Sequence, residues 1–372
     1  MPDSARPRLT PAVADVRRAV RAGLFPFSGT GETEVADVAS GRGFRSTSTP
    51  SSPPVPENGK PLVLVALSGG PDSLALAAAV AFEAPRAGVS AGAVVVDHQL
   101  QDGSDVVAER AAEQARALGL DPVRVVRVTV ADDGGPEASA RAARYKALSS
   151  VAADLGAVAV LLGHTLDDQA ETVLLGLARG SGSASLQGMA PVAGLYRRPL
   201  LGIRRSMTVQ ACADAGLEPW ADPHNDDPAY TRVRVRKNVL PVLEAELGPG
   251  VADALARTAE QLREDSAALD AFAEEVVEDL AEHVEAGIAL PAAALAANPP
   301  ALRQRLIRLV AASEFGVSLS RAHTLEIARL VTDWHGQDGV DVPGAKVTRV
   351  GGMIEFRAST NGHGETGADG RG

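Results

Sequence analysis

Residues 61–67 read PLVLVAL, and residues 68–73 read SGGPDS. The first stretch is short and continuously apolar, which is typical of a strand buried on both faces of a parallel sheet. The second is a glycine-rich turn, and a helix over residues 74–84 is expected to follow it. This order of strand, turn and helix predicts the first unit of an alternating α/β fold.

The same alternation continues along the chain. Apolar runs predict further strands over 93–97, 123–130 and 157–162, and helical patterns lie between and after them, over 105–118, 137–155 and 168–178. Successive parallel strands need crossover helices, and these crossovers are right-handed. The sequence therefore predicts an α/β fold with a doubly wound parallel sheet.

The rest of the chain differs in composition from this region. We predict five parts: an N-terminal helix over 1–22, a disordered linker or insertion over 23–59, the α/β domain over 60–240, a smaller and mainly helical domain over 241–358, and a disordered tail over 359–372. Helical patterns from 239 to 283 and from 301 to 331 define the second domain. Short strands are expected to end it, over 340–356.

Composition excludes several classes of protein. The chain has 372 residues and a single cysteine, Cys212, which rules out a disulfide framework and a CxxC-type zinc or iron–sulfur site within the chain. No apolar run is long enough for a transmembrane helix, and the N-terminus does not resemble a signal peptide. We therefore expect a cytoplasmic protein with no membrane partner, and Cys212 is expected to be a small buried residue.

The charge is unevenly distributed. The net charge of −11 argues by itself against a nucleic-acid partner. Residues 197–241, however, contain eight Arg and Lys against five Asp and Glu, a local balance of +3. One basic segment in an acidic chain favours a local anion or nucleic-acid site.

The turn after the first strand predicts a phosphate site. Glycines let the backbone approach an anion, and a helix N-terminus supplies free N–H groups. In this turn, serine hydroxyls are further donors, and Asp72 is a candidate Mg²⁺ ligand between phosphates. The alternative is a tight strand–helix connection with a capping Asp or Ser. The predicted cofactor-binding residues are Ser68, Gly69, Gly70, Pro71, Asp72 and Ser73.

Carboxylates follow two of the other predicted strands. Asp97 ends the strand over 93–97, and His164, Asp167 and Asp168 follow the strand over 157–162. Strand ends meet at one sheet edge, so these groups are expected near the phosphate turn, where they can accept protons or, for Asp168, bind Mg²⁺. The alternative is that Asp167 or Asp168 caps the next helix.

Arginines and a tryptophan complete the candidate residues. Arg141 and Arg144 share a helical face, and Arg232, Arg234 and Arg236 alternate with valines, which predicts a strand with three guanidinium groups on one side. Such a stripe suits RNA phosphates, although a solvated or ion-paired face is the alternative. Trp220 is expected to pack in the core rather than stack on a base.

Five motifs together resemble one known family. They are VDH at 96–98, ARAARY at 140–145, GHTLDDQAET at 163–172, WADPHND at 220–226 and YTRVRVR at 230–236. With SGGPDS they resemble the tRNA(Ile)-lysidine synthase family of the PP-loop ATP pyrophosphatases. ALRQRLIR and VPGAKVTRVGGMIEF, within 301–356, are similar to the family's second domain. Gln99 and Val233 stand where the family usually has Gly and Asn.

The resemblance implies an ATP- and Mg²⁺-dependent ligase. Residues 60–240 would be the PP-loop catalytic domain, and 241–358 would bind substrate. Free lysine would be joined to C2 of the wobble cytidine in the CAU anticodon of tRNA(Ile), through an adenylated cytidine, with release of AMP and pyrophosphate. A homodimer is one alternative for the assembly. The implied catalytic residues are Asp72, Asp97, Arg141, Arg144, His164, Asp167 and Asp168, with the choice of general base left open, and the implied tRNA contacts are Arg232, Arg234 and Arg236.

Three other functions share some of these features. A PP-loop tRNA thiolase would use sulfur as the nucleophile, but such enzymes commonly need paired cysteines. A small-molecule amidating synthetase would explain the acidic charge but not the arginine-rich segment. A nucleotide-binding module without turnover would not need two carboxylates facing the phosphates.

Overall fold

The computed structural model describes residues 9–27, 59–99, 103–129, 136–180, 182–285 and 287–359. The predicted linker, apart from its two ends, and almost all of the predicted tail lie outside these ranges. The chain divides into two compact units, with the boundary between Arg263 and Glu264. The predicted domain limit at 240–241 lies earlier and stays a prediction.

The first unit contains a six-stranded sheet in the order β3-β2-β1-β4-β6-β5. The four long strands and β6 are parallel, and only the short edge strand β5 is antiparallel. All six residues of β1 are buried, as expected for a strand covered on both faces. The predicted fold class is confirmed. The bounds are β1 Leu62–Leu67, β2 Ser90–Asp97, β3 Val123–Arg127, β4 Ala157–Leu162, β5 Val192–Ala193 and β6 Tyr196–Arg197.

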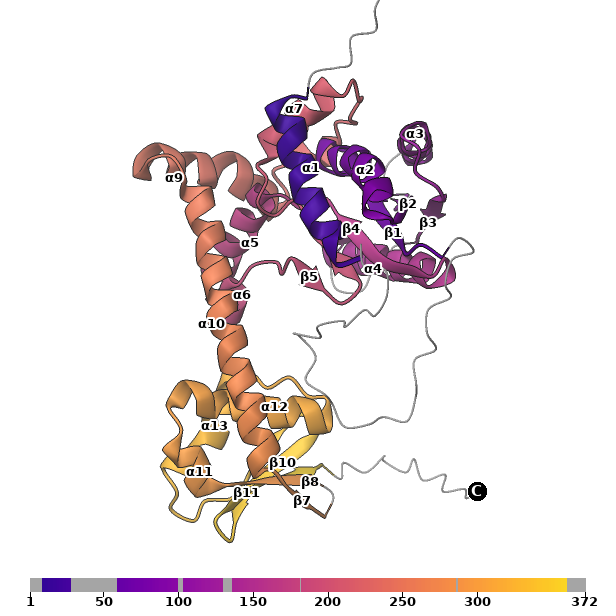
Figure 1. Ribbon diagram of the computed structural model, residues 1–372. Coiled ribbons are helices and arrows are strands. Elements are labelled where there is room, and N and C mark those ends of the chain that lie inside the picture. The colour runs from indigo at the N-terminus through magenta and orange to yellow at the C-terminus, as the bar shows by residue number, and fades with distance from the viewer. Residues whose placement is uncertain are drawn as a thin grey trace, which may run out of the picture. The chain divides into compact units, whose positions relative to one another are not determined.

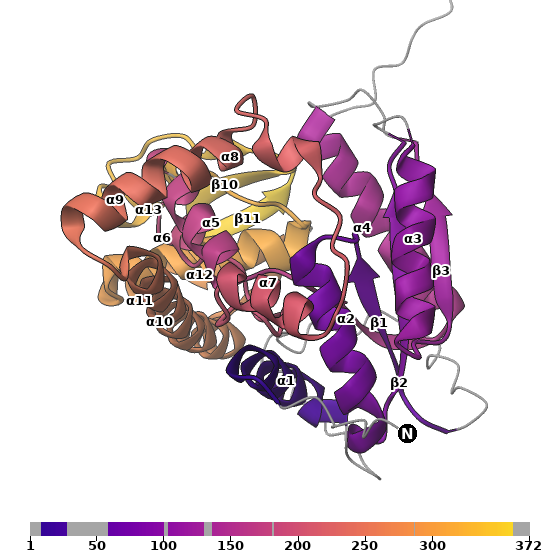
Figure 2. The ribbon, with the colours of Figure 1, turned by 90° about the horizontal axis from the view of Figure 1, so that it is seen from above.

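Helices cover both faces of this sheet. Alternate residues of β1 point to opposite sides: Val63, Val65 and Leu67 join one core, and the even-numbered residues join the other. The first core is closed by α1 (Pro11–Leu24), α2 (Pro71–Glu83), α3 (Ser104–Ala117) and α7 (Arg205–Asp214), and the second by α4 (Pro136–Asp154). Figure 2 shows α1 beside α2. This layering is the doubly wound arrangement, in which ligands bind at the carboxyl ends of the strands.

The N-terminal helix α1 packs onto the α/β unit. Thr10 caps it, its hydroxyl accepting a hydrogen bond from the Val13 amide, and Val16, Val20 and Leu24 form its buried stripe. This stripe faces α2 and α7 (Figure 1). A short 3₁₀ turn, Phe25–Phe27, follows. The helix predicted over 1–22 is therefore present where the structure describes it, from Pro11 onward.

The arginine-rich segment forms a helix, so the strand predicted from the alternation over 232–236 is wrong. Residues Thr231–Arg234 form α8, and Val235–Val239 continue it as a π-helix before α9 (Leu240–Leu247). Val233 and Val235 are both buried, but on a helix rather than on one side of a strand. Tertiary contacts override the β-propensity of alternating valines, because Arg232 and Arg236 lie four residues apart and reach the same carboxylate, that of Glu171.

Shorter helices and one long helix complete the first unit. Helix α5 follows β4 and packs against the π-helix through Leu166, Ala170 and Val235. Among the described residues, no helix is long and apolar enough to cross a membrane. The remaining bounds are η2 Ala84–Ala87, α5 Leu166–Ala178, α6 Ser183–Leu186, η3 Pro223–Asp226 and α10 Val251–Leu280, the last of which contains the unit boundary.

The second unit has its own core and its own sheet. Five antiparallel strands run in the order β7-β8-β11-β10-β9, and three helices pack on them around Leu306, Ile327 and Phe356. The strands predicted at the end of the chain are present, but β7 and β8 were not expected. The bounds are β7 Glu282–Val284, β8 Gly287–Pro291, α11 Ala292–Ala297, α12 Pro300–Phe315, α13 Arg321–Thr332, β9 Val340–Val342, β10 Ala345–Val350 and β11 Met353–Ala358.

Candidate active site

The glycine-rich turn connects β1 to the N-terminus of α2. Gly69 has φ of +82°, a conformation that glycine adopts without strain. Gly70 caps α2 with no side chain, and Pro71 occupies the first helical position. Among the described residues no side chain caps this helix end, so its free N–H groups and positive dipole end can meet an anion.

Ser73 holds the turn together rather than projecting from it. Its hydroxyl donates to the Gly70 carbonyl at 3.0 Å and accepts from the Ser68 amide at 3.1 Å. Ser68, which is exposed, has its hydroxyl 3.1 Å from the same Ser73 oxygen. Both serines were expected to add hydroxyl donors at the phosphate site. In this structure the Ser73 hydroxyl donates within the turn, and Ser68 is the exposed serine.

The ends of β1 and β4 meet at this turn. A Cβ atom at Gly163 would lie 3.1 Å from the Asp72 carbonyl carbon and oxygen and from the Ser73 nitrogen. Glycine at this position therefore allows the chain after β4 to approach the first turn of α2. This close approach places Asp72, which follows β1, and Asp167 and Asp168, which follow β4, at one sheet edge.

Thr165 is the N-cap residue of α5, and Asp168 completes the cap from the third helical position, whereas Asp167 takes no part in it. The Thr165 hydroxyl accepts from the Asp168 amide, and Asp168 Oδ2 accepts from the Thr165 amide and hydroxyl, each at 2.8 Å. This is a capping box with Asp at the third position. Capping therefore uses Asp168 Oδ2, and Asp168 Oδ1 remains available to accept from Arg205.

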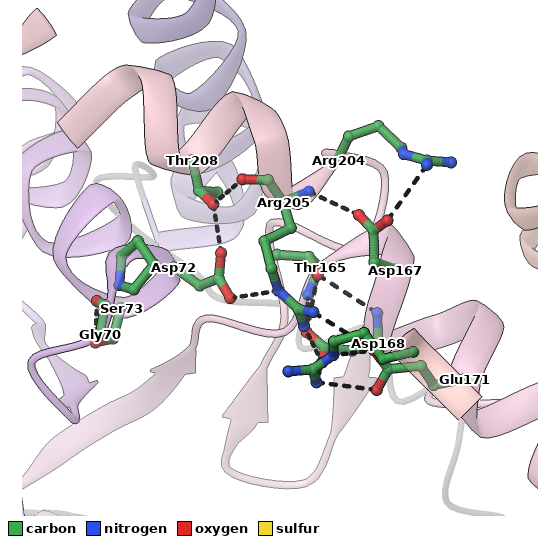
Figure 3. A network of polar contacts seen from close by, with 12 residues as sticks. Gly70, Asp72, Ser73, Thr165, Asp167, Asp168, Glu171, Arg204, Arg205 and Thr208 are labelled. Atoms are coloured by element: carbon green, nitrogen blue, oxygen red, sulfur yellow. Dashed lines mark hydrogen bonds and ion pairs between the residues drawn. The ribbon is translucent and has the colours of Figure 1, made fainter. Parts of the chain in front are cut away.

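Arg205 joins carboxylates from two loops (Figure 3). Its Nε donates to Asp72 Oδ2 at 3.2 Å, and its Nη2 donates to Asp168 Oδ1 at 2.6 Å. The other Asp72 oxygen accepts from the Thr208 hydroxyl, one turn further along α7. Helix α7 thus brings a guanidinium and a hydroxyl between the phosphate turn and the start of α5.

Two further carboxylates extend the network. Asp167 accepts from the Arg205 amide at 2.7 Å and pairs with Arg204. Glu171 is fully buried and pairs with Arg205, Arg232 and Arg236. Arg234, by contrast, points to the Pro228 and Ala229 carbonyls. The three predicted RNA-contact arginines therefore do not form one stripe, because two of them face the acidic network.

The network shifts the pKa values of its members in opposite directions. Burial raises the pKa of Asp72, although the Thr208 hydroxyl and Arg205 oppose this. Burial would also raise the pKa of Asp168, but Arg205 and the Thr165 hydrogen bonds outweigh it and hold that pKa below its usual value. Asp72 is therefore the stronger base of the two.

Asp97 lies in a separate cavity beside the turn. The cavity has a volume of about 240 Å³, and Ser68, Asp97, His98, Arg144 and Trp220 are among the residues that line it. Asp97 is almost fully buried, and its Oδ1 accepts from the Gln99 amide at 3.0 Å. The prediction that Trp220 packs in the core is wrong: it is half-buried and lines the cavity, and its backbone amide donates to the Gly69 carbonyl.

His164 lies among arginines. Burial, reinforced by the positive charges of Arg144, Arg198 and Arg141, lowers the pKa of His164 to about 3. The imidazole is therefore neutral at pH 7. Arg141, which is exposed, donates to the Tyr145 hydroxyl.

Asp72 and Asp168 are the candidate Mg²⁺ ligands of the site. Each directs one carboxylate oxygen at the Arg205 guanidinium, which is the cation between them in this structure. Mg²⁺ in nucleotide sites commonly takes one or two carboxylates together with phosphate oxygens. Asp72 and Asp168 are the residues that would hold it.

Comparison with known proteins agrees with this architecture. Residues 47–243 match the family model described as a PP-loop domain, and residues 290–354 match the one described as the TilS substrate binding domain. The tRNA(Ile)-lysidine synthase of Leifsonia xyli subsp. xyli is 65% identical over 300 residues, covering 80% of this chain and 90% of that protein. The chain belongs to the tRNA(Ile)-lysidine synthase family.

Other members of the tRNA(Ile)-lysidine synthase family show the same relation. The enzyme of Streptomyces coelicolor is 54% identical, with 80% of this chain and 85% of that protein covered. That of Salinispora arenicola is 46% identical over 93% of this chain and 96% of that protein. Among solved structures, the U34-tRNA thiolase NcsA from Methanococcus maripaludis superposes with a TM-score of 0.50 at 19% identity, covering 68% of this chain and 80% of that one, which supports the fold alone.

Four residues of the site were not predicted from the sequence: Glu171, Arg205, Thr208 and Trp220. A signal existed for two of them. Glu171 lies three residues after Asp168 on the same helical face, and Arg205 belongs to the basic segment over 197–241. The pairing of Arg205 with Asp72 joins positions far apart in sequence, and no local pattern reports it.

Proposed function

We propose that this chain ligates free lysine to C2 of the wobble cytidine of tRNA(Ile) with a CAU anticodon, in an ATP-dependent reaction through an adenylated cytidine. Lysidine, AMP and pyrophosphate are the products. Membership of the tRNA(Ile)-lysidine synthase family supports the overall reaction. The observation that carries the proposal is that the Ser68–Ser73 turn, which includes Asp72, lies at the same sheet edge as three further carboxylates. These are Asp167, Asp168 and Glu171.

The turn and the adjacent cavity suit ATP. The cavity beside Asp97 would take the nucleoside, with Trp220 against its base, and the free amides at the start of α2 would hold the phosphates. Cleavage between the α and β phosphates places charge on the leaving pyrophosphate, which these amides stabilise. Mg²⁺ bound by Asp72 and Asp168 would neutralise charge on the phosphate oxygens.

A second hollow suits the amino acid. It has a volume of about 500 Å³ and is lined by Asp167, Glu171 and Glu244 together with Arg204, Arg205 and Arg236. Lysine carries one carboxylate and two amines, so a lining of both signs matches it. The attacking amine must lose a proton, and Asp72, Asp97, Asp167 and Asp168 remain the candidate acceptors.

The RNA would meet the same edge from the α4 side. The wobble base must leave its stack to be adenylated at O2, and arginines suit both base edges and phosphates. Arg141, Arg144 and His164 lie on this side. Arg234, whose guanidinium is bound only to local carbonyls and a hydroxyl among the described residues, is the remaining contact candidate in its segment. Cytoplasmic localisation fits this substrate, and the homodimer stays one alternative.

The chain lacks the cysteines that a thiolase of this fold commonly uses. Cys212 is the only cysteine; its thiol donates to the Pro71 carbonyl at 3.2 Å, and burial raises its pKa to about 12. A protonated, buried thiol is a poor nucleophile or cluster ligand. The prediction of a small buried cysteine is confirmed, and amine attack is favoured over sulfur transfer.

Mass spectrometry of nucleosides tests the proposal directly. A tRNA(Ile) transcript with the CAU anticodon is incubated with the full chain, ATP, Mg²⁺ and lysine, and the cytidine is expected to gain lysine less water. The Asp72→Asn variant is expected to lose activity by at least about a hundredfold, since it removes a charge at the phosphates. The exposed Asp154→Asn, at the opposite end of α4, serves as the control.

Two results would decide against the proposal. An adduct with sulfide or ammonia, but none with lysine, would assign the chain to another PP-loop reaction. No AMP under any condition would leave only nucleotide binding.

A further inference from the structure

Arg198 is a buried arginine without a carboxylate partner. It follows β6 directly and is 8% exposed. Its Nη1 donates to the Ala190 carbonyl at 2.8 Å, and its Nε has no hydrogen-bond partner. In the part of the chain that the structure describes, no Asp or Glu forms an ion pair with it. Burying a guanidinium without a counter-charge costs desolvation free energy. An anion bound at Arg198 would therefore stabilise the protein.

The arginines of the acidic network differ sharply from Arg198. Arg204, Arg205, Arg232 and Arg236 all pair with carboxylates within 4 Å. Arg144 resembles Arg198 instead: within the described ranges it pairs with no carboxylate, and it lines the cavity beside Asp97. The four arginines of the acidic network are therefore neutralised by carboxylates. Among the described residues, the charges of Arg198 and Arg144, which lie elsewhere in the site, have no such partner.

Strand register places Arg198 and His164 on the same side of the sheet. Val160 pairs with Tyr196 and Leu161 with Arg197, so Arg198 continues the side of Tyr196, which packs toward α4. His164 continues the side of Val160 and Leu162 in the same way. Arg141 and Arg144 lie on α4 itself, and the positive charges of Arg198, Arg141 and Arg144 all act on His164. The three arginines therefore form one basic cluster near the neutral His164, at the carboxyl edge of β4 and β6.

We propose that Arg198, together with Arg144, forms a binding site for a phosphate group, separate from the phosphate turn at Ser68–Ser73. The proposal rests on the proposed function for the choice of ligands. The shared chemistry is a phosphate oxygen anion, and two sources are available: a backbone phosphate of the anticodon loop, or a phosphate of ATP. A guanidinium fixed by one hydrogen bond to a carbonyl presents its remaining donors in a defined direction, which suits paired hydrogen bonds to phosphate.

Binding measurements on the full chain separate the two sources. The variants are Arg198→Gln and Arg198→Lys. The control is Arg86→Gln, which makes the same substitution at an exposed arginine on the short helix before β2. One arm measures the affinity for the tRNA(Ile) transcript without ATP over a range of salt concentrations. The other arm measures the affinity for ATP with Mg²⁺ and without RNA.

A loss of about tenfold to a hundredfold in Arg198→Gln, in one arm only, is expected. If the RNA arm changes, the slope of log affinity against log salt should fall by about 1, as for one lost phosphate contact. If the ATP arm changes, the phosphate belongs to the nucleotide. Arg198→Lys should retain part of the affinity, because it keeps the charge but not the paired donors. Arg86→Gln should match the wild type.

Stability distinguishes binding from a purely structural role. An unpaired buried charge destabilises the free protein, so Arg198→Gln should unfold at the same or a higher urea concentration than the wild type. Unchanged affinity in both arms would overturn the phosphate site, and so would a destabilised Arg198→Gln together with an Arg198→Lys that binds no better. Failure of the wild type to form lysidine would instead contradict the proposed function, and the ATP arm would still test the site.

Discussion

The carboxylate of Glu171 accepts two parallel hydrogen bonds from Arg236, at 2.7 Å from Nε to Oε1 and at 3.1 Å from Nη2 to Oε2. Glu171 lies on α5, which follows β4, and Arg236 lies on the π-helix. The same carboxylate also pairs with Arg205 on α7 and with Arg232 on α8. One buried charge therefore links four helical elements around the carboxyl edge of the sheet. Paired Arg–carboxylate bonds of this kind fix orientation as well as distance.

Loss of the Glu171 charge should destabilise the first unit strongly. Glu171→Gln keeps the shape but leaves three guanidinium groups facing a neutral amide, and breaking a buried ion pair in this way costs about 3 kcal/mol or more. Urea unfolding followed by fluorescence measures it. The chain has two tryptophans, so a Trp334→Phe background restricts the signal to Trp220, in the first unit.

An exposed ion pair provides the control for Glu171. Asp226 pairs with Lys237 at the surface. Asp226→Asn should change the free energy of unfolding by less than about 1 kcal/mol. Equal effects of Glu171→Gln and Asp226→Asn would mean that the buried network contributes no more than a surface pair.

His164 should make the stability of the first unit depend on pH. Its pKa is lowered to about 3 in the folded protein, against about 6.5 in an unfolded chain, so the unfolded state takes up the proton first as pH falls. Stability is therefore fully present above pH 6.5 and decreases below it, by about 1 kcal/mol per pH unit. Urea unfolding at pH 7.5, 6.0 and 5.0 should show a shallower decline in His164→Gln than in the wild type.

Other titrating groups do not confuse this comparison. His98, whose pKa burial also lowers, contributes in the same direction and is present in both proteins. Parallel declines in the wild type and His164→Gln would show that His164 is charged in the folded protein, contrary to its surroundings.

Gln169 should hold the segment that follows α6. Its side-chain amide donates to the Met189 carbonyl at 3.0 Å and accepts from the Met189 amide at 2.7 Å. Gln169→Met has a similar length but leaves both backbone groups without their partner, at a cost of about 1–3 kcal/mol. Hydrogen exchange at the Met189 amide should become faster, and the urea midpoint should fall.

A surface glutamine gives the matched substitution for Gln169. Gln210 is exposed on α7, and Gln210→Met should leave both measurements close to the wild type. Unchanged exchange at Met189 in Gln169→Met would mean that other contacts hold this segment.

The sequence predicted the parallel sheet well but predicted the partners in the site poorly. Strands β1, β2 and β4 contain apolar runs that end at turns, as expected for strands that are buried on both faces. Strand β3 at the sheet edge reads VRVVR, and its valines are its only apolar residues. Strand β7 has three residues and includes Glu282 and His283, so it carries no such signal. Strand β8 has five residues and is bounded by Gly287 and Pro291, which are typical of turns rather than strand ends. Alternating Arg and Val over 232–236 favoured a strand locally, while the buried Glu171 favoured a helix with arginines four residues apart. Whether residues 232–236 form a strand or a helix therefore depends on Glu171, which lies about sixty residues earlier in the chain.

The backbone conformation of Gln99 leads to a further prediction. The structure gives Gln99 a φ of +54°, the left-handed region that favours glycine. A side chain there costs about 1 kcal/mol, partly offset because glycine is more flexible in the unfolded chain. Gln99→Gly should therefore raise the free energy of unfolding of the first unit by up to about 1 kcal/mol. The backbone hydrogen bond from residue 99 to Asp97 should remain.

The reverse substitution nearby serves as the control for Gln99. Gly103 has φ of +77° and open space around its Cβ position, so Gly103→Ala acts through the backbone alone. It should destabilise the first unit by about 1 kcal/mol. If Gln99→Gly also destabilises the first unit, the Gln99 side chain makes a contact that outweighs its backbone strain.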